Sequence, residues 1–291
     1  MTTKRLLACA FAALIGGVLV AKADYFSYNL HGRLEDSVTR FNKQAANLLP
    51  IPRGYIAGCT TSPSSVTILQ ITGCYSVDST NAVVMNQTST FTKSTAGSWT
   101  AGSGNNGMGA GLTIAFNTWY HVFQIVNGGL VDYYFDTNVG AANAPAGTTA
   151  FRRIGSFLTN GSSQIISFSQ NGDEFLWLAA IADITTSTLS TTATLFTLSG
   201  VPPGVKVNAL MRGGVANSGT VDILINSPDE TTIAGGSIGS NANIVAPSLG
   251  GAFSISIRTN TTQQIRAVAG GASTTLDEFT YGWIDTRGKN N

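Results

Sequence analysis

Short apolar runs separated by turn residues dominate the middle of the chain. Between residues 117 and 178 these runs alternate with three pairs, Asn127-Gly128, Asn160-Gly161 and Asn171-Gly172. An Asn-Gly pair accepts the positive φ angles that a tight hairpin requires, so each pair predicts a turn between antiparallel strands. Apolar and polar residues alternate most regularly over 131–136, which predicts a strand whose successive side chains point to opposite faces.

The same alternation continues beyond residue 200. Roughly seven such runs over about a hundred residues are typical of a β-sandwich. We therefore predict an all-β protein with two antiparallel β-sandwich or jelly-roll-like domains, residues 53–178 and 179–287, followed by a polar tail at 288–291. The apolar positions expected to share the inner faces of the second domain are Val205, Val207, Ala209, Met211, Val221, Ile223, Ile225, Phe253, Ile255, Ile257, Ile265, Ala267, Ala269, Phe279, Tyr281 and Trp283.

Two further segments precede the predicted strands. Lys4-Arg5, the apolar run from Leu6 to Val20 and the triplet Ala21-Lys22-Ala23 follow one another as in a secretory signal peptide, so we expect cleavage after Ala23. The alternative for residues 1–23 is an uncleaved apolar anchor. Residues 24–52 are predicted to form an amphipathic helix and a linker. The apolar stripe of this helix is Leu30, Leu34, Val38, Phe41, Ala45 and Leu48.

A single apolar stripe on a helix has to be buried. One hypothesis docks the stripe on the chain's own β-structure, and the other pairs it with copies of itself in a short trimeric bundle. Leu34, Phe41 and Leu48 fit a heptad repeat, which makes them the candidate oligomer seam.

Composition restricts the classes of function. Charged residues make up 11% of the chain and hydrophobic residues 43%, a balance that argues against a disordered chain. It suits secreted or virion β-proteins, whose solubility comes from hydroxyl and amide groups. The net charge is +1 and the sequence shows no basic patch, so we do not expect nucleic-acid binding.

Cys59 and Cys74 lie in segments that read as neighbouring strands. A disulfide between them would contribute about 3 kcal/mol by closing a short loop, and two buried free thiols are the alternative. No cysteine pair or nearby histidine has metal-ligand spacing. The glycine-rich stretch at 97–111 lacks the Lys-Ser/Thr pair of a phosphate-binding loop, so we predict a flexible surface loop there.

Residues with catalytic chemistry are few. Asp173-Glu174 is the one acidic pair in the middle of the chain, and because neighbours on a strand point to opposite faces we interpret it as part of a turn. His121 lies among apolar residues and is expected to be packed. Arg152-Arg153 could form cross-strand ion pairs with Asp132 or Asp136, and the alternative is that the two arginines bind anionic sugars. Without a nucleophile–histidine–carboxylate set, we expect no catalytic residues, no cofactor and no metal.

Aromatic residues offer a second kind of candidate. An aromatic ring can stack on a sugar, although a place in the core or in a subunit contact is the more common use of such residues. The residues concerned are Trp99, Trp119, Tyr133 and Tyr134.

Six motifs follow one another along the chain: TWYHVF, VDYYFDT, FRRIGSF, IISFSQNGDEF, VPPGVKV and GWIDTRG. In these motifs and their order, over roughly residues 53–287, the chain resembles a family of phage and prophage structural proteins described as tail, tail-fibre or other virion proteins. The resemblance implies a mostly-β, often trimeric protein on the exterior of the particle, in contact with other virion proteins.

We therefore expect a homotrimeric tail, tail-fibre or spike component that takes part in attachment to the host surface and its glycans, and not an enzyme. The alternative is a β-rich protein, exported through its signal-like N-terminus, that binds or cleaves cell-surface polysaccharide.

Overall fold

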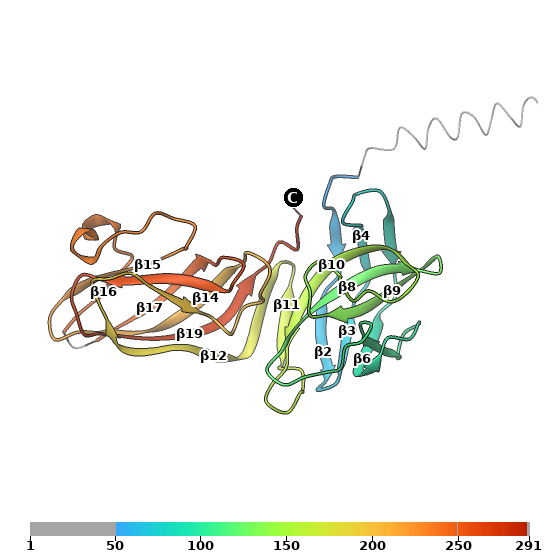
Figure 1. Ribbon diagram of the computed structural model, residues 1–291, viewed down its shortest axis with the longest axis horizontal. Coiled ribbons are helices and arrows are strands. Elements are labelled where there is room, and N and C mark those ends of the chain that lie inside the picture. The colour runs from blue at the N-terminus through green and yellow to red at the C-terminus, as the bar shows by residue number, and fades with distance from the viewer. Residues whose placement is uncertain (1–50, 249, 290–291) are drawn as a thin grey trace, which may run out of the picture. The chain divides into compact units, whose positions relative to one another are not determined.

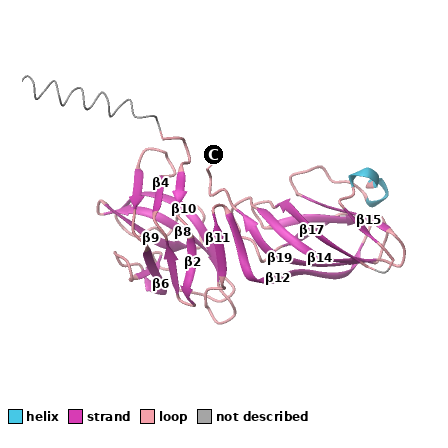
Figure 2. Ribbon diagram, turned by 180° about the vertical axis from the view of Figure 1, so that it is seen from behind, coloured by secondary structure: helices cyan, strands magenta, loops and turns pink. Residues whose placement is uncertain are grey.

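A computed structural model describes residues 51–248 and 250–289 (Figure 1). Residues 53–291 form one compact unit. In its described part, strands are joined by loops, and the helical elements are two single-turn 3-10 helices, η1 (Gly235–Ser237) and η2 (Gly239–Asn241) (Figure 2). The predicted all-β class is thus confirmed. The helix predicted within residues 24–52 and the signal-like segment lie outside the described residues, apart from residues 51 and 52.

The first half of the unit contains two sheets. Their strands are β1 (Ile56–Gly58), β2 (Thr61–Ser65), β3 (Ile68–Ile71), β4 (Cys74–Val77), β5 (Val84–Gln87), β6 (Phe91–Ser98), β7 (Asn106–Met108), β8 (Trp119–Asn127), β9 (Leu130–Asp136) and β10 (Thr148–Leu158). A three-stranded sheet has the order β1-β4-β5, and a seven-stranded sheet has the order β10-β8-β9-β7-β6-β3-β2.

The second half adds two more sheets. Their strands are β11 (Phe168–Asn171), β12 (Glu174–Leu189), β13 (Thr194–Thr197), β14 (Asn208–Ala216), β15 (Val221–Asn226), β16 (Ile244–Ala246), β17 (Gly251–Arg258), β18 (Gln264–Ala269) and β19 (Thr274–Ile284). A five-stranded sheet has the order β11-β12-β19-β14-β17, and a four-stranded sheet has the order β13-β18-β15-β16. Buried residues of both sheets, such as Met211 and Ile225, belong to one apolar cluster.

Two of the predicted turns close hairpins. Asn127 pairs with Leu130 across β8 and β9, and the two residues between them, Gly128 and Gly129, have φ angles of 56° and 79°. This double positive φ is the requirement of a type I′ turn, so the turn is centred one residue later than the Asn-Gly pair. β11 and β12 are also joined by two residues, with Asn171 opposite Glu174, but here only Gly172 has a positive φ, 60°.

Strand β9 is buried on both faces. Its alternation places Tyr133 and Phe135 in the main apolar cluster, while Tyr134 stacks on Phe123 in a second cluster on the other face. Asp132 is also buried, where it pairs with the fully buried Lys93 at 2.8 Å. Asp132 is a polar position of the alternation, and yet it does not face the solvent. Its ion pair with Lys93 compensates for the hydration that the carboxylate loses on burial.

The antiparallel prediction needs one correction. β7 runs parallel to both β6 and β9. The chain returns to start β7 through the glycine-rich loop, which is anchored rather than free: Lys93 Nζ donates to the carbonyls of Thr100 and Gly102 at 2.7 and 3.0 Å. Together with Asp132, these carbonyls occupy the three donors of the buried ammonium group.

A bulge changes the inner face of β19. Leu210 pairs with Gly282, but the next residue, Met211, pairs with Thr280, so Tyr281 is left without a partner across the ladder. The side of the strand that faces the core changes at this point. Phe279, predicted to be inward, is therefore 41% exposed, whereas Glu278 is fully buried.

The expected boundary between residues 178 and 179 falls inside a strand. β12 runs through it from Glu174 to Leu189 and pairs with both β11 and β19. Aromatic rings from both halves meet beside this strand: the Trp283 ring stacks on Phe175 at 4.8 Å and lies edge-on to Trp119 at 5.4 Å. The two halves consequently share one apolar core.

Candidate functional site

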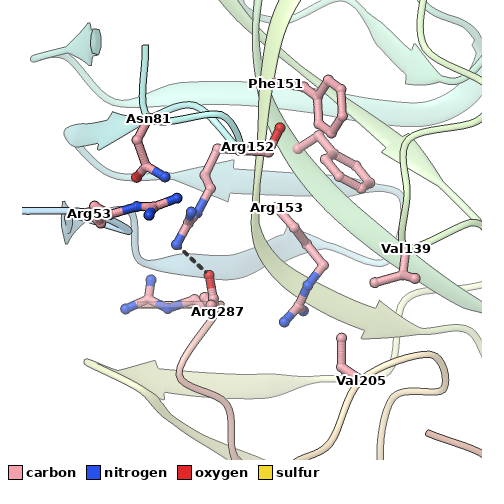
Figure 3. Close-up of a pocket in the computed structure, with 11 residues that line it drawn as sticks. Arg53, Asn81, Val139, Phe151, Arg152, Arg153, Val205 and Arg287 are labelled. Carbon is pink, nitrogen blue, oxygen red and sulfur yellow. Dashed lines mark hydrogen bonds between the residues drawn. The ribbon is translucent and has the colours of Figure 1, made fainter. Parts of the chain in front are cut away.

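Four arginines line one cavity of about 320 Å³ (Figure 3). They come from three distant parts of the chain: Arg53 precedes β1, Arg152 and Arg153 lie on β10, and Arg287 follows β19. We call this cavity the arginine pocket. Its other lining residues are Ser79, Asn81, Phe123, Val139, Phe151, Val205 and Gly288.

Arg152 is the most unusual of the four. Its side chain is buried, and its Nη2 donates to the carbonyl oxygens of Gly54 and Arg287 at 3.1 and 2.8 Å. Its Nε is buried without a hydrogen-bond partner among the described residues. Burial, followed by the positive charges of Arg153 and Arg287, lowers the pKa of Arg152, and the negative charge of Asp78 opposes this effect. The pocket thus holds a guanidinium group without a bound carboxylate.

The other buried arginine, Arg287, is held in place by the chain around it. Its Nη2 lies 2.7 Å from Asp173 Oδ1, and its Nη1 donates to the carbonyl of Cys59 at 3.2 Å. Lys289 shares the same carboxylate oxygen at 2.7 Å. Burial alone would raise the pKa of Asp173, but the hydrogen bonds and charges of these two cations bring it below its usual value. Asp173 is therefore already engaged by two cations.

A close backbone contact makes this arrangement possible. Gly54 has a φ of 67°, and a Cβ atom at this position would lie 2.6 Å from the carbonyl oxygen of Lys289. Only glycine fits a left-handed conformation with so close a neighbour at low cost. The segment after β19 can therefore lie against the start of β1, which brings Arg53 and Arg287 to the same cavity.

One wall of the arginine pocket is apolar. Phe151 is partly exposed, packs edge-on against Phe123, and lies on the opposite face of β10 from Arg152 (Figure 3). Val139 and Val205 complete this wall. The guanidinium group of Arg152 and the ring of Phe151 therefore border the pocket from opposite faces of β10.

The sugar-stacking candidate Trp99 borders a second cavity. Trp99 is partly exposed and borders a cavity of about 510 Å³ together with Asn86, Gln87, Asn127 and the exposed Leu130. Its indole N–H donates to the carbonyl of Tyr133 at 3.0 Å, which fixes the orientation of the ring.

The remaining aromatic candidates are core residues. Tyr133 and Tyr134 are fully buried, and burial raises the pKa of both hydroxyl groups far above the ordinary value. Trp119 is buried against Trp177 and Trp283 and borders a third cavity. Neither tyrosine exposes a ring face on which a sugar could stack.

His121 is packed, as expected. Its Nδ1 lies 2.9 Å from Ser156 Oγ, but both side chains are buried. Burial, followed by the charge of Arg153, lowers the pKa of His121 to about 3, so the ring is neutral at physiological pH. The nearby Asp285 is bound to Arg153 rather than to the histidine, so the carboxylate–histidine contact of a catalytic triad is missing. The burial of His121 and Ser156 also keeps a substrate from reaching them.

The expected arginine ion pairs form with other partners. Arg153 pairs with Asp285 and not with Asp132 or Asp136, and Arg152 binds backbone carbonyls. Asp136 instead accepts hydrogen bonds from the amides of Asn138 and Asn143. The local strand pattern could not reveal the ion pair of Arg153, because Asp285 lies 132 positions away in the sequence.

The remaining predicted residues are the two cysteines, the acidic pair and the candidate oligomer seam. Cys59 and Cys74 form a disulfide between the end of β1 and the start of β4, which decides between the two alternatives left by the sequence. Asp173 lies in the turn between β11 and β12, and Glu174 begins β12. The candidate seam of Leu34, Phe41 and Leu48 lies outside the described residues.

Within residues 51–248 and 250–289, no three histidine, cysteine or acidic side chains are grouped so as to hold a metal ion. No helix in this part of the chain has the length and apolar character needed to cross a membrane. Comparison with models of known protein families and with curated protein sequences gives no match for this chain.

Proposed function

We propose that this chain is a structural protein on the exterior of a phage particle, a tail, tail-fibre or spike component that takes part in attachment to the host surface. The proposal includes assembly as a homotrimer, contact with other virion proteins, and the two β-sandwich or jelly-roll-like domains expected from the sequence. It starts from the six motifs through which the chain resembles such proteins.

The observation that supports it most is where these motifs meet. TWYHVF contributes Trp119, FSQNGDEF contributes Phe175, and GWIDTRG contributes Trp283 to one aromatic cluster. Beside it, an arginine of FRRIGSF binds an aspartate of GWIDTRG. Motifs spread over more than 160 residues thus contact one another in a single cluster. Motifs that pack together in this way are expected in proteins that share a fold. The contacts therefore favour a fold common to this chain and the phage proteins over a chance likeness of sequence.

Purified particles provide the test. The chain should copurify with particles through a density gradient, and antibodies raised against residues 53–289 should label the particle surface and slow adsorption to host cells. Antibodies against an internal particle protein are the control, because they should do neither. Recovery of the chain only from the medium, free of particles, would contradict the proposal.

The Trp99 cavity favours the second candidate function, an exported protein that binds cell-surface polysaccharide. A partly exposed indole beside the amide side chains of Asn86, Gln87 and Asn127 has the composition of a neutral-sugar site. Export of the chain by a host without phage genes, together with binding to isolated envelope polysaccharide that Trp99→Ala abolishes, would support this alternative.

A further inference from the structure

We infer that Asn171 is a site of spontaneous deamidation, at which the folded chain slowly converts an asparagine of an exposed hairpin into aspartate and isoaspartate. The reaction consumes water, releases ammonia and needs no enzyme. This inference goes beyond the proposed function and does not rest on it.

The chemistry follows from an asparagine that is followed by a glycine. The backbone nitrogen of Gly172 attacks the side-chain carbon Cγ of Asn171, and the new bond closes a five-membered succinimide ring. The amide nitrogen leaves as ammonia, with the proton of the attacking N–H. Water then opens the ring at either of its carbonyls, which gives aspartate or isoaspartate. Glycine favours the first step because, without a Cβ atom, its nitrogen is accessible and its backbone turns freely.

The chain has four such pairs, and the fold restrains them to different degrees. They are Asn106-Gly107, Asn127-Gly128, Asn160-Gly161 and Asn171-Gly172. Ring closure requires the asparagine side chain to turn toward the next residue and the backbone to leave its strand or turn geometry. Hydrogen bonds of the side chain and strand pairing at the asparagine have to break first, so they slow the reaction.

Asn160 and Asn127 are restrained through their side chains. Asn160 Oδ1 accepts hydrogen bonds from the backbone N–H groups of Ser162 and Gln164 at 2.9 and 3.0 Å. Asn127 Nδ2 donates to the carbonyl of Ala146 at 2.9 Å. The backbone of Asn127 is also paired on both sides, with β9 and with β10. Both asparagines therefore have to lose native contacts before they can form the ring.

Asn106 is restrained through the glycine that follows it. Gly107 is buried in β7, which lies between β6 and β9 in its sheet. A Cβ atom on Gly107 would lie 2.9 Å from the ring of Phe135 and 3.1 Å from Cβ of Lys93. The backbone of Gly107 is thus tightly enclosed, so its nitrogen has little room to move toward the side chain of Asn106.

Asn171 lacks each of these restraints. Asn171 and Gly172 are exposed in the turn between β11 and β12, and open space surrounds the position of a Cβ atom on Gly172. The Asn171 side chain forms no hydrogen bond with a residue of the described ranges. β11 is the edge strand of its sheet, so Asn171 is paired on one side only, with Glu174. Gln170 Nε2 donates to the carbonyl of Gly172 at 2.8 Å, which leaves the attacking nitrogen free.

Isoaspartate at this position changes the hairpin. It leads the main chain through the former side chain and lengthens the backbone, which a two-residue turn cannot absorb without a change of geometry. β11 carries Phe168, whose ring packs edge-on against Trp177, and Gln170, whose Oε1 accepts the N–H of Thr61 at 2.7 Å. Deamidation therefore weakens the attachment of β11 to both halves of the fold.

Incubation of the purified full chain at mildly alkaline pH tests the inference, because the attacking nitrogen has to lose its proton. Peptide mapping by mass spectrometry follows the loss of each asparagine, and chain unfolded in guanidinium chloride is the control. In the folded chain we expect Asn171 to react about fivefold faster than the other three or more, since each hydrogen bond that has to break slows the reaction about fivefold. In the unfolded chain the four rates should become similar, because the contacts that distinguish them are gone.

Asn171→Gln is the decisive variant, because glutamine forms the corresponding larger ring far more slowly. Most of the isoaspartate formed by the folded wild type should be missing in this variant. Asn127→Gln, the matched change in the hairpin between β8 and β9, should retain most of it.

Two results would overturn the inference. One is that another asparagine of an Asn-Gly pair reacts fastest in the folded chain. The other is that Asn171→Gln forms as much isoaspartate as the wild type. Neither result bears on whether the chain copurifies with particles, so a failure here is distinguishable from a failure of the proposed function.

Discussion

Arg153 and Asp285 form a two-pronged ion pair that joins β10 to the segment after β19. Nη1 lies 2.7 Å from Oδ2 and Nη2 lies 2.7 Å from Oδ1, although the two residues are 132 positions apart in the sequence. Burial alone would raise the pKa of Asp285, but the charge and hydrogen bonds of Arg153, with the amide of Arg287, bring it below its ordinary value. Asp285 is therefore ionised, and the charged pair links the two halves of the fold.

Removing one member of this pair should destabilise the fold. Asp285→Asn leaves Arg153 without its counter-ion in a site that is nearly closed to water, and we expect a loss of about 3 kcal/mol or more in the free energy of unfolding. Urea denaturation followed by tryptophan fluorescence measures it. Asp229→Asn is the matched control: its partners Lys206 and Arg258 are exposed, so its loss of stability should be much smaller than that of Asp285→Asn. Equal losses in the two variants would contradict this account.

Glu278 should make the protein less stable as the pH rises. Burial, followed by the negative charge of Asp183, raises the pKa of Glu278 to about 8, and a hydrogen bond from Thr280 opposes the shift. The folded protein therefore holds this proton at pH values where the unfolded chain has released it. Stability from this group is complete below about pH 4.5 and is lost as the pH rises through about 8, by roughly 5 kcal/mol in total.

Glu278→Gln isolates this effect, because an amide has nearly the same shape and carries no charge. Its free energy of unfolding should change much less than that of the wild type between pH 5 and pH 9, as measured by urea titration at each pH. If the free energy of unfolding changed with pH equally in the two proteins, Glu278 would be ionised in the folded state and the prediction would be wrong.

The disulfide should contribute measurably to stability. It joins cysteines 15 residues apart, and closing a loop of this length is worth about 3 kcal/mol. The Cys59→Ser, Cys74→Ser double variant should lose about this amount in chemical denaturation, and wild-type protein treated with a reductant should lose the same. No change in the denaturation midpoint on reduction would argue that the bond does not form in solution.

The N-terminal segment gives a prediction from the sequence alone. If residues 1–23 are a signal peptide, protein produced in a Gram-negative host should appear in the periplasm and begin at Asp24. Intact-mass measurement decides this, with Ala23→Arg as the variant that should block cleavage. A full-length chain in purified particles would favour the anchor instead.

Self-association through the predicted helix is the last prediction. A helix with one apolar stripe buries it in a partner, and a heptad seam of Leu34, Phe41 and Leu48 suits a trimer. Light scattering should give the mass of three chains for the wild type and of one chain for Phe41→Asp, because three carboxylates would meet in an apolar seam. Asn42→Asp, next to Phe41 on the polar side of the helix, is the control that should stay trimeric. A single-chain mass for the wild type would refute the seam.

The sequence by itself determined the class of the fold and most of its strands and hairpins. Period-two alternation and Asn-Gly turns depend on neighbouring residues, so the strands around Val207, Ile223 and Ile265 and the hairpins at Asn127 and Asn171 could be predicted. The choice between disulfide and thiols at Cys59 and Cys74 could not, because it depends on the distance between two strands.

The tertiary structure alone decided where charges and rings meet. Arg53, Arg152 and Arg287 stand far apart in the sequence, and nothing in their local pattern shows that they line one pocket. The bulge at Tyr281 likewise turned Phe279 outward and Glu278 inward, since one extra residue in a strand exchanges its faces. Both outcomes depend on long-range pairing of strands, because burial in a folded chain is a property of what lies opposite a residue rather than of what lies beside it.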